Sequence, residues 1–287
     1  MAVLRTVIQN THQSLEEAGI PDARLEAEVL VMNVMRMPRQ SIFAEQETEV
    51  SAQQQEALNS LLARRYLREP LAYILGMREF YGINVFLTPS VLIPRPETEG
   101  LVEHALFMSM MGMESRELII ADVGTGSGAI AINLAIHLPA ARIFAVDVAD
   151  EVLDVAAYNI RSHGVGDRVT LGIGDLLDAV PEPVDLIVAN LPYIPSDRIP
   201  NLQPEVQQEP ILALDGGLDG LDLVRRLLMQ SEDKLKPNGI ILLEMDPEQI
   251  PIVKTLVKHH FPQGSTSVEK DLAGMDRILT IHQLAQV

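Results

Sequence analysis

A glycine-rich loop and an acidic residue further along the chain are the first groups that could do chemistry. The loop DVGTGSG (122–128) joins a strand-like run to a helix-like run, and Asp147 ends the next strand-like run. Glycines let a backbone turn tightly and approach a ligand, and the following helix N-terminus favours an anion. A carboxylate at Asp147 can accept both hydroxyl groups of a ribose. Taken separately, the loop could be a ligand-free turn and Asp147 a helix cap, but together they predict a nucleoside-like ligand.

Two classes of ligand fit this pair. A dinucleotide fingerprint prefers G-x-G-x-x-G, whose last glycine falls one position later than Gly128 does here. S-adenosylmethionine also carries a ribose and an adenine, but it ends in an amino acid whose carboxylate suits the start of a helix. The loop favours S-adenosylmethionine and leaves a dinucleotide open.

The end of the third strand-like run adds an acid and an apolar side chain. Asp175 can accept a hydrogen bond from an adenine amino group, and Leu176 can pack on the ring face. A helix cap is the alternative interpretation of Asp175. The residues alone therefore predict that Gly124, Gly126, Gly128, Asp147, Asp175 and Leu176 contact the cofactor.

The fourth strand-like run ends at Asn190, which Leu191, Pro192 and Tyr193 follow. The Asn190 side-chain carbonyl and the Leu191 backbone carbonyl could accept both hydrogens of a planar amide or aromatic amine, which turns its nitrogen toward a sulfonium methyl group. Tyr193 offers a ring face to the flat substrate group or to the sulfonium. We therefore predict methyl transfer to nitrogen without a catalytic histidine or carboxylate. The alternative is a strand that merely ends in a proline turn.

These residues need a parallel sheet to bring them together. In the last two thirds of the chain, apolar strand-like runs alternate with helical runs, which predicts an α/β fold with a mostly parallel sheet covered on both faces. The first part of the chain shows helical spacing, with a capping box at Ser51 and Gln54. Short aromatic and β-branched runs between the two parts predict a hairpin. The predicted domains are a helical domain 1–70, a hairpin linker 71–95 and a ligand-binding domain 96–287.

Composition argues against several classes of function. The net charge is −18 and every lysine falls at or after Lys234, which leaves no basic stripe for nucleic acid. The chain has no cysteine, and its histidines lack converging partners, so no metal site is expected. No apolar run approaches the roughly 18 residues of a membrane span, and no signal peptide is recognisable. We expect a cytoplasmic monomer.

Longer motifs carry a family resemblance. The segment PRPETE (94–99) and the tract ALDGGLDGLDL (213–223) are more specific than any glycine loop. With them the chain resembles the HemK/PrmC family, the release factor glutamine methyltransferases. The matching stretches are EPLAYILGMREFYG (69–82), VLIPRPETEGLVE (91–103), DVGTGSGAIAI (122–132), AVDVADEVLDVAAYN (145–159), ANLPYIP (189–195), LQPEVQQEPILALDGGLDGLDLVRRLL (202–228) and DLAGMDRIL (271–279).

The resemblance implies a helical N-terminal domain that recognises the substrate, a hairpin linker and a seven-stranded, Rossmann-like methyltransferase domain. It implies transfer of a methyl group from S-adenosylmethionine to the side-chain amide of the glutamine in the Gly-Gly-Gln motif of class I peptide chain release factors, which would be the protein partners in translation termination. It further implies that residues 190–193 hold that amide. The cofactor contacts that it implies are Gly124, Thr125, Gly126, Ser127, Gly128, Asp147, Leu176 and Asn190. Arg95 and Glu97 are expected at the mouth of the active site, or else they form a proline-rich helix entry in which Glu97 favours the first turn.

The chain differs from the family's usual sequence at two positions, and two alternative functions stay open. Relatives usually have proline where this chain has Leu191, which keeps the backbone carbonyl but loses the fixed φ, and they often have an aromatic residue in place of Leu176. The motif ANLPY is also similar to that of ribosomal RNA adenine dimethylases, which are basic and lack PRPETE. A non-catalytic S-adenosylmethionine-binding protein is the second rival.

Overall fold

The structure is a computed structural model that describes residues 2–112 and 117–283. The chain forms two compact units: unit 1 comprises residues 1–76 and 204–208, and unit 2 comprises residues 77–203 and 209–287. The boundary after Gly76 falls inside the range predicted as a linker. Nothing in the sequence indicated that 204–208 belongs with the helices of unit 1.

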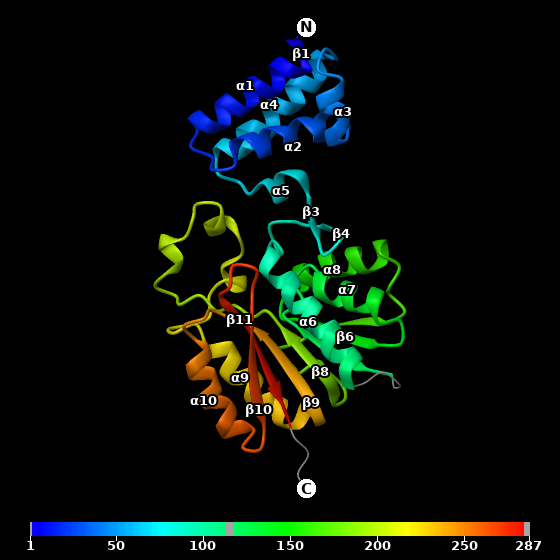
Figure 1. The fold of residues 1–287 in the computed structure, drawn as a ribbon, viewed down its shortest axis with the longest axis vertical. Coiled ribbons are helices and arrows are strands. Elements are labelled where there is room, and N and C mark those ends of the chain that lie inside the picture. The colour runs from blue at the N-terminus through cyan, green and yellow to red at the C-terminus, as the bar shows by residue number, and fades with distance from the viewer. Residues whose placement is uncertain (1, 113–116, 284–287) are drawn as a thin grey trace. The chain divides into compact units, whose positions relative to one another are not determined.

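Unit 1 is a helical bundle (Figure 1). The predicted capping box opens its longest helix: the Ser51 hydroxyl accepts from Gln54 N at 3.2 Å, and the Gln54 side chain accepts from Ser51 N at 2.9 Å. Apolar faces of the helices meet around Leu15, Leu30 and Leu58, which are almost completely buried. The elements are β1 (Ala2–Val3), α1 (Leu4–Glu17), α2 (Ala23–Met35), α3 (Arg39–Ala44), β2 (Glu49–Val50), α4 (Ala52–Tyr66), α5 (Leu71–Leu75) and the 3-10 helix η2 (Val206–Gln208).

A buried arginine holds segment 204–208 to the bundle. Arg65 of α4 is 3% exposed and donates to Glu26 at 2.6 Å and to Glu205 at 2.9 Å. Arg68 donates to the same Glu205 oxygen at 3.2 Å. A buried guanidinium is destabilising unless its donors are satisfied, so these bonds make Glu205 part of the bundle.

Unit 2 begins with an antiparallel hairpin of β3 (Met77–Phe80) and β4 (Ile83–Phe86). Tyr81 and Gly82 turn the chain with positive φ. The remaining elements are α6 (Pro96–Gly112), β5 (Ile119–Val123), α7 (Ala129–His137), β6 (Arg142–Asp147), α8 (Asp150–Ser162), β7 (Val169–Ile173), β8 (Val184–Ala189), the 3-10 helices η1 (Ile199–Asn201) and η3 (Ile211–Ala213), α9 (Asp222–Lys234), β9 (Leu235–Glu244), α10 (Ile250–His260), β10 (Ser265–Lys270) and β11 (Asp276–His282).

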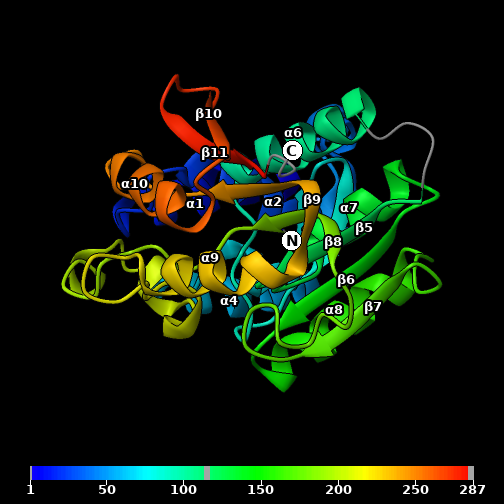
Figure 2. The same ribbon diagram turned by 90° about the horizontal axis from the view of Figure 1, so that it is seen from below.

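The predicted sheet is confirmed, with strand order β10-β11-β9-β8-β5-β6-β7. The strands from β9 to β7 are parallel, and β11 and β10 add an antiparallel edge. Helices α6, α7 and α8 pack in succession, α9 packs on α10, and Figure 2 shows α6 and α9 on opposite sides of β9. Every residue of β5 and β8 is buried, which explains their continuous apolar sequences.

Strand order fixes where a crevice opens. From β5 the chain moves outward through β6 and β7, and it then returns to β8 on the other side of β5. Ligands of such sheets bind beyond the carboxyl ends of the strands at this switch point. The last residues of β5 and β8 are Val123 and Ala189, which directly precede the glycine loop and Asn190.

Candidate active site

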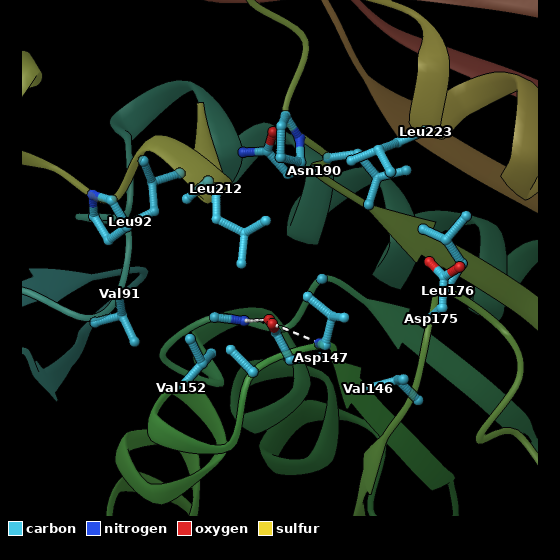
Figure 3. A pocket seen from close by; sticks show the side chains of 18 of the residues that line it. Val91, Leu92, Val146, Asp147, Val152, Asp175, Leu176, Asn190, Leu212 and Leu223 are labelled. Atoms are coloured by element: carbon cyan, nitrogen blue, oxygen red, sulfur yellow. Dashed lines mark hydrogen bonds between the residues drawn. The ribbon is translucent and has the colours of Figure 1, made fainter. Parts of the chain in front are cut away.

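A cavity of about 440 Å³ lies at the switch point (Figure 3). Strand ends and the segments 90–92 and 210–213 form its mostly apolar wall, and a few carboxylates and one amide supply polar groups. Small-molecule sites have this composition. Of the predicted cofactor residues, the cavity brings together Gly124, Gly126, Asp147, Asp175, Leu176 and Asn190; Thr125, Ser127 and Gly128 do not line it.

Hydrogen bonds to β6 and within the loop hold the glycine loop in place. Gly124 N and Thr125 N both donate to Val146 O, at 2.9 and 3.0 Å, and Gly128 N donates to Thr125 O at 2.9 Å. Gly124, Gly126 and Gly128 all have positive φ, which favours glycine at each position. These three N–H groups therefore already have acceptors within the protein.

Asp122 lies beneath the loop and was not among the predicted site residues. Its Oδ2 accepts from the Thr125 hydroxyl at 2.6 Å and from Ala131 N at 3.1 Å. Burial raises the pKa of Asp122 to about 7, although these two hydrogen bonds act to lower it. An internal carboxyl thus occupies part of the α7 N-terminus that the sequence alone would leave to a ligand.

Asp147 lines the cavity in Figure 3 and is held by backbone donors. Its Oδ2 accepts from Gly126 N at 3.0 Å and its Oδ1 accepts from Val148 N at 2.8 Å. Burial raises the pKa of this carboxyl, and the backbone hydrogen bonds oppose that rise. A carboxylate has about four acceptor sites, so these two bonds leave it able to accept from hydroxyl groups.

Asp175 and Leu176 lie together on one side of the cavity (Figure 3). No α-helix begins at Asp175 in the described part of the chain, so it is not a helix cap. It forms an ion pair with Arg226 of α9, a cavity residue that no sequence motif indicated. Leu176 is 7% exposed and has φ of 56°, an uncommon conformation for a non-glycine residue.

Asn190 comes directly after β8, and its side chain is held from α6. Its Nδ2 donates to Thr98 Oγ1 at 3.0 Å, and Thr98 is 4% exposed. Leu191 also lines the cavity, and a Cβ added at Gly124 would lie 3.2 Å from its Cδ2. The apolar side chain at this position therefore packs against the glycine loop.

Glu244 ends β9 beside Thr98 and was not predicted as a site residue. Burial raises the pKa of Glu244 to about 7, and hydrogen bonding by the Thr98 hydroxyl acts to lower it. Burial and the neighbouring Glu244 carboxyl also raise the pKa of Tyr193 to about 12, which keeps its phenol neutral. Tyr193 does not line the cavity. A strand-end acid at the same rim as Asn190 was the sequence signal that could have identified Glu244.

The ALDGG tract holds the backbone that follows Asn190. Ile194 N donates to Leu214 O at 3.1 Å, and Gly216 N donates to Ile194 O at 2.9 Å. The Gln249 side chain donates to Tyr193 O at 2.8 Å. Gly220 approaches Tyr193 O so closely that any Cβ would overlap it. The glycines therefore serve close backbone packing beside the predicted catalytic residues.

Arg95 and Glu97 do not line the cavity, so a role at its mouth stays a prediction. Arg95 donates to Glu209 at 2.5 Å, and the other Glu209 oxygen accepts from Ile93 N at 3.1 Å. These two hydrogen bonds hold the PRPETE region next to Glu209, which directly precedes the cavity-lining segment 210–213. Glu97 lies in the first turn of α6. In the described ranges, no three His, Cys, Asp or Glu residues could hold a metal ion, and no helix there is long and apolar enough to cross a membrane.

The sheet and its cavity define the fold of the class I S-adenosylmethionine-dependent methyltransferases. A crystal structure of the hMettl16 catalytic domain in complex with MAT2A 3′UTR hairpin 6 is 17% identical, with a TM-score of 0.58, covering 76% of this chain and 81% of that one. The T. thermophilus 16S rRNA N2 G1207 methyltransferase in complex with AdoMet and guanosine is 16% identical, with a TM-score of 0.51, covering 72% of this chain and 49% of that one.

Sequence comparison gives the family. The model of the PrmC N-terminal domain matches residues 6–76, and that of ribosomal protein L11 methyltransferase (PrmA) matches residues 104–218. A release factor glutamine methyltransferase from Moorella thermoacetica is 40% identical over 275 residues, which are 96% of each chain. The chain belongs to the release factor glutamine methyltransferase family, and the predicted family and enzyme class are confirmed.

Proposed function

We propose that this protein transfers a methyl group from S-adenosylmethionine to the side-chain amide nitrogen of the glutamine in the Gly-Gly-Gln motif of class I release factors. The observation that carries the proposal is Asn190, whose amide lies at the cavity with its Nδ2 bound to Thr98. This arrangement leaves Oδ1 as an acceptor for a substrate N–H. Family membership supports the choice of protein substrate, and action on release factors implies a cytoplasmic enzyme.

The cavity residues fit the cofactor. Asp147 would accept the ribose hydroxyls, and Leu176 would pack on the adenine face. Asp175 would accept from the adenine amino group with the oxygen that Arg226 leaves available. The same fold binds AdoMet in the T. thermophilus enzyme. When bound, S-adenosylmethionine supplies a methyl group made electrophilic by its sulfonium cation.

The chain's own groups would prepare the nucleophile. A glutamine amide nitrogen is weakly nucleophilic because its lone pair is delocalised. Asn190 Oδ1 and Leu191 O would each accept a hydrogen bond from one of its two N–H groups, which directs the nitrogen toward the methyl carbon. The nitrogen held in this way would form the bond to the methyl carbon, and the electron pair of the broken carbon–sulfur bond would stay on sulfur. The nitrogen then releases one proton to water, so no side-chain base is required.

Unit 1 is the part we assign to recognition of the release factor. A glutamine side chain offers too little surface for a specific complex, and unit 1 contains the match to the PrmC N-terminal domain. We treat residues 1–70 as the recognition domain and 71–95 as the linker, and we expect the protein to act as a monomer.

Methyl-group mapping tests the proposal. The protein would be incubated with isotopically labelled S-adenosylmethionine and a purified class I release factor, and the methyl group located by peptide mass spectrometry. We expect the label on the glutamine of Gly-Gly-Gln and on no other residue. An unlabelled Gly-Gly-Gln peptide, with label elsewhere in the release factor, would reject the substrate.

RNA is the second candidate substrate, because the fold is shared with the hMettl16 domain bound to an RNA hairpin. The net charge of −18 opposes this assignment. Binding to phosphates releases counterions, so RNA affinity would fall steeply between low and moderate salt. We expect turnover on the release factor to change little over that range, and label in RNA would favour the alternative.

A further inference from the structure

We propose that Thr98 and Glu244 form a relay that fixes which end of the Asn190 amide faces the substrate, which makes Thr98 a positioning residue for methyl transfer. The inference rests on the proposed function, because it concerns how the substrate amide is held. Neither residue lines the cavity, and both act through Asn190.

The two ends of an asparagine amide have similar shape and opposite hydrogen-bonding character. With Oδ1 toward the cavity, Asn190 can accept a substrate N–H. With the amide rotated by half a turn, its NH₂ group would face the substrate NH₂ group, and two donors would oppose each other. Thr98 alone cannot exclude this rotated state, because a hydroxyl both donates and accepts.

Glu244 removes that ambiguity. Asn190 and Glu244 follow the paired residues Ala189 and Leu243 of the neighbouring parallel strands β8 and β9, so they lie side by side at the rim. Thr98, on α6, accepts from Asn190 Nδ2 at 3.0 Å, and its hydroxyl also acts to lower the pKa of the Glu244 carboxyl. An ionised carboxyl group only accepts hydrogen bonds, so in the relay that we propose the Thr98 hydroxyl donates to Glu244. Its lone pairs then face Asn190, which must present Nδ2 to Thr98 and Oδ1 to the cavity.

The surroundings of Glu244 leave Thr98 as its partner. Glu244 is 3% exposed, and within the described ranges its Oε2 has no hydrogen-bond partner. Arg277 and Arg95 act on it electrostatically, but they pair with Asp271 and Glu209 respectively. Glu97 and Tyr193 are the other ionisable groups that face it. A buried carboxyl with so few partners is costly to stability, which a positioning role explains.

Protonation of Glu244 would loosen the relay. A protonated carboxyl can donate to Thr98, which frees the Thr98 hydroxyl to donate to Asn190 Oδ1 and permits the rotated amide. Burial raises the pKa of Glu244 to about 7, so we expect kcat of the wild type to fall as the pH drops below about 7.

Paired substitutions at Thr98 test the relay on the full-length enzyme. Thr98→Val keeps the side-chain shape and removes the hydroxyl, whereas Thr98→Ser keeps the hydroxyl. We expect Thr98→Val to lower kcat roughly 10- to 100-fold, the range associated with a misplaced reacting group, with KM for the release factor and Kd for S-adenosylmethionine close to wild type. Thr98→Ser should retain most of the wild-type kcat. Equal losses in the two variants would overturn the relay.

Glu244→Gln tests the other half. Glutamine keeps the shape but can present either a donor or an acceptor to Thr98, so we expect an intermediate kcat that no longer falls below pH 7. The double variant Thr98→Val/Glu244→Gln should be no slower than Thr98→Val, because either change breaks the same relay. Additive losses, or an unaltered pH profile in Glu244→Gln, would count against it. Absence of glutamine methylation by the wild type would instead reject the proposed function.

Discussion

Asn190 is the residue on which the proposed chemistry depends, because it lines the cavity and is also hydrogen-bonded to the buried Thr98. Its Nδ2 is committed to Thr98, while Asp147 and Asp175 on the cavity wall are held by backbone groups or by Arg226. The side-chain carbonyl of Asn190 differs from these carboxylates because it is a neutral acceptor. It can accept one hydrogen of a substrate amide without adding a charge beside the sulfonium.

Substitution of Asn190 separates catalysis from cofactor binding. Asn190→Ala removes the acceptor, and we expect turnover to fall on the order of 100-fold or more, as for other groups that stabilise a transition state. The affinity for S-adenosylmethionine should stay nearly unchanged, because Asp147 and Leu176 remain. Turnover is measured by methyl transfer to the release factor and affinity by calorimetry. Turnover close to wild type would remove Asn190 from the mechanism.

The Leu191 side chain makes a packing contact that its residue type alone does not predict. The family's usual proline would fix φ at this position, but here an apolar side chain packs toward Gly124 and is 5% exposed. The contact links the predicted catalytic segment to the glycine loop. The sequence showed the departure from the family but could not show this contact, since packing depends on residues far apart along the chain.

At the scale of elements, the strands and the mostly parallel sheet were predictable, whereas several side-chain contacts between elements were not. Apolar runs such as LIVA (186–189) and the glycine loop have local signatures that predict β8 and the turn after β5. Two contacts, Thr98 with Asn190 and Arg226 with Asp175, join elements that lie far apart in sequence. No local sequence pattern could predict them. For the same reason, the sequence did not show that segment 204–208 belongs to unit 1, because that placement depends on its contact with Arg65.

The loop that holds Tyr193 gives an element-scale prediction. Gly220 and Gly274 both have positive φ, but a Cβ would overlap Tyr193 O at Gly220 and would meet nothing within 4 Å at Gly274. We expect Gly274→Ala to cost about 1 kcal/mol from backbone conformation alone. Gly220→Ala should cost more and also lower kcat, because it displaces the backbone beside the active site. Chemical denaturation and turnover assays would measure both, and equal effects of the two changes would contradict this explanation.

The capping box of α4 gives a second prediction at this scale, confined to unit 1. Ser51→Ala removes the acceptor for Gln54 N, so we expect a loss of about 1 kcal/mol from the stability of the bundle. Ser60→Ala, at an exposed position in the same helix, is the control and should have no such cost. Hydrogen exchange of α4 amides reports the change. Similar exchange in the two variants would show that the cap contributes little.

At the scale of the whole molecule, the buried carboxyls of unit 2 should make its stability depend on pH. Burial raises the pKa of Asp122 and of Glu244 to about 7, well above the ordinary values of 3.8 and 4.5. Between the ordinary value and about 7, the folded state holds protons that the unfolded state has released. The free energy of unfolding therefore falls as the pH rises through this window.

A substitution that cannot titrate isolates one of these carboxyls. Between pH 5 and pH 8, the free energy of unfolding should fall less in Glu244→Gln than in the wild type. For a pKa shift of this size, the difference should be on the order of 3 kcal/mol. Glu103→Gln, at an exposed position on α6, is the matched control and should follow the wild type. Denaturation of unit 2, followed at both pH values for the three proteins, gives the comparison. If Glu244→Gln and the wild type lost the same stability over this range, Glu244 would have to be ionised throughout it, and the pH arm of the Thr98 relay would fail with it.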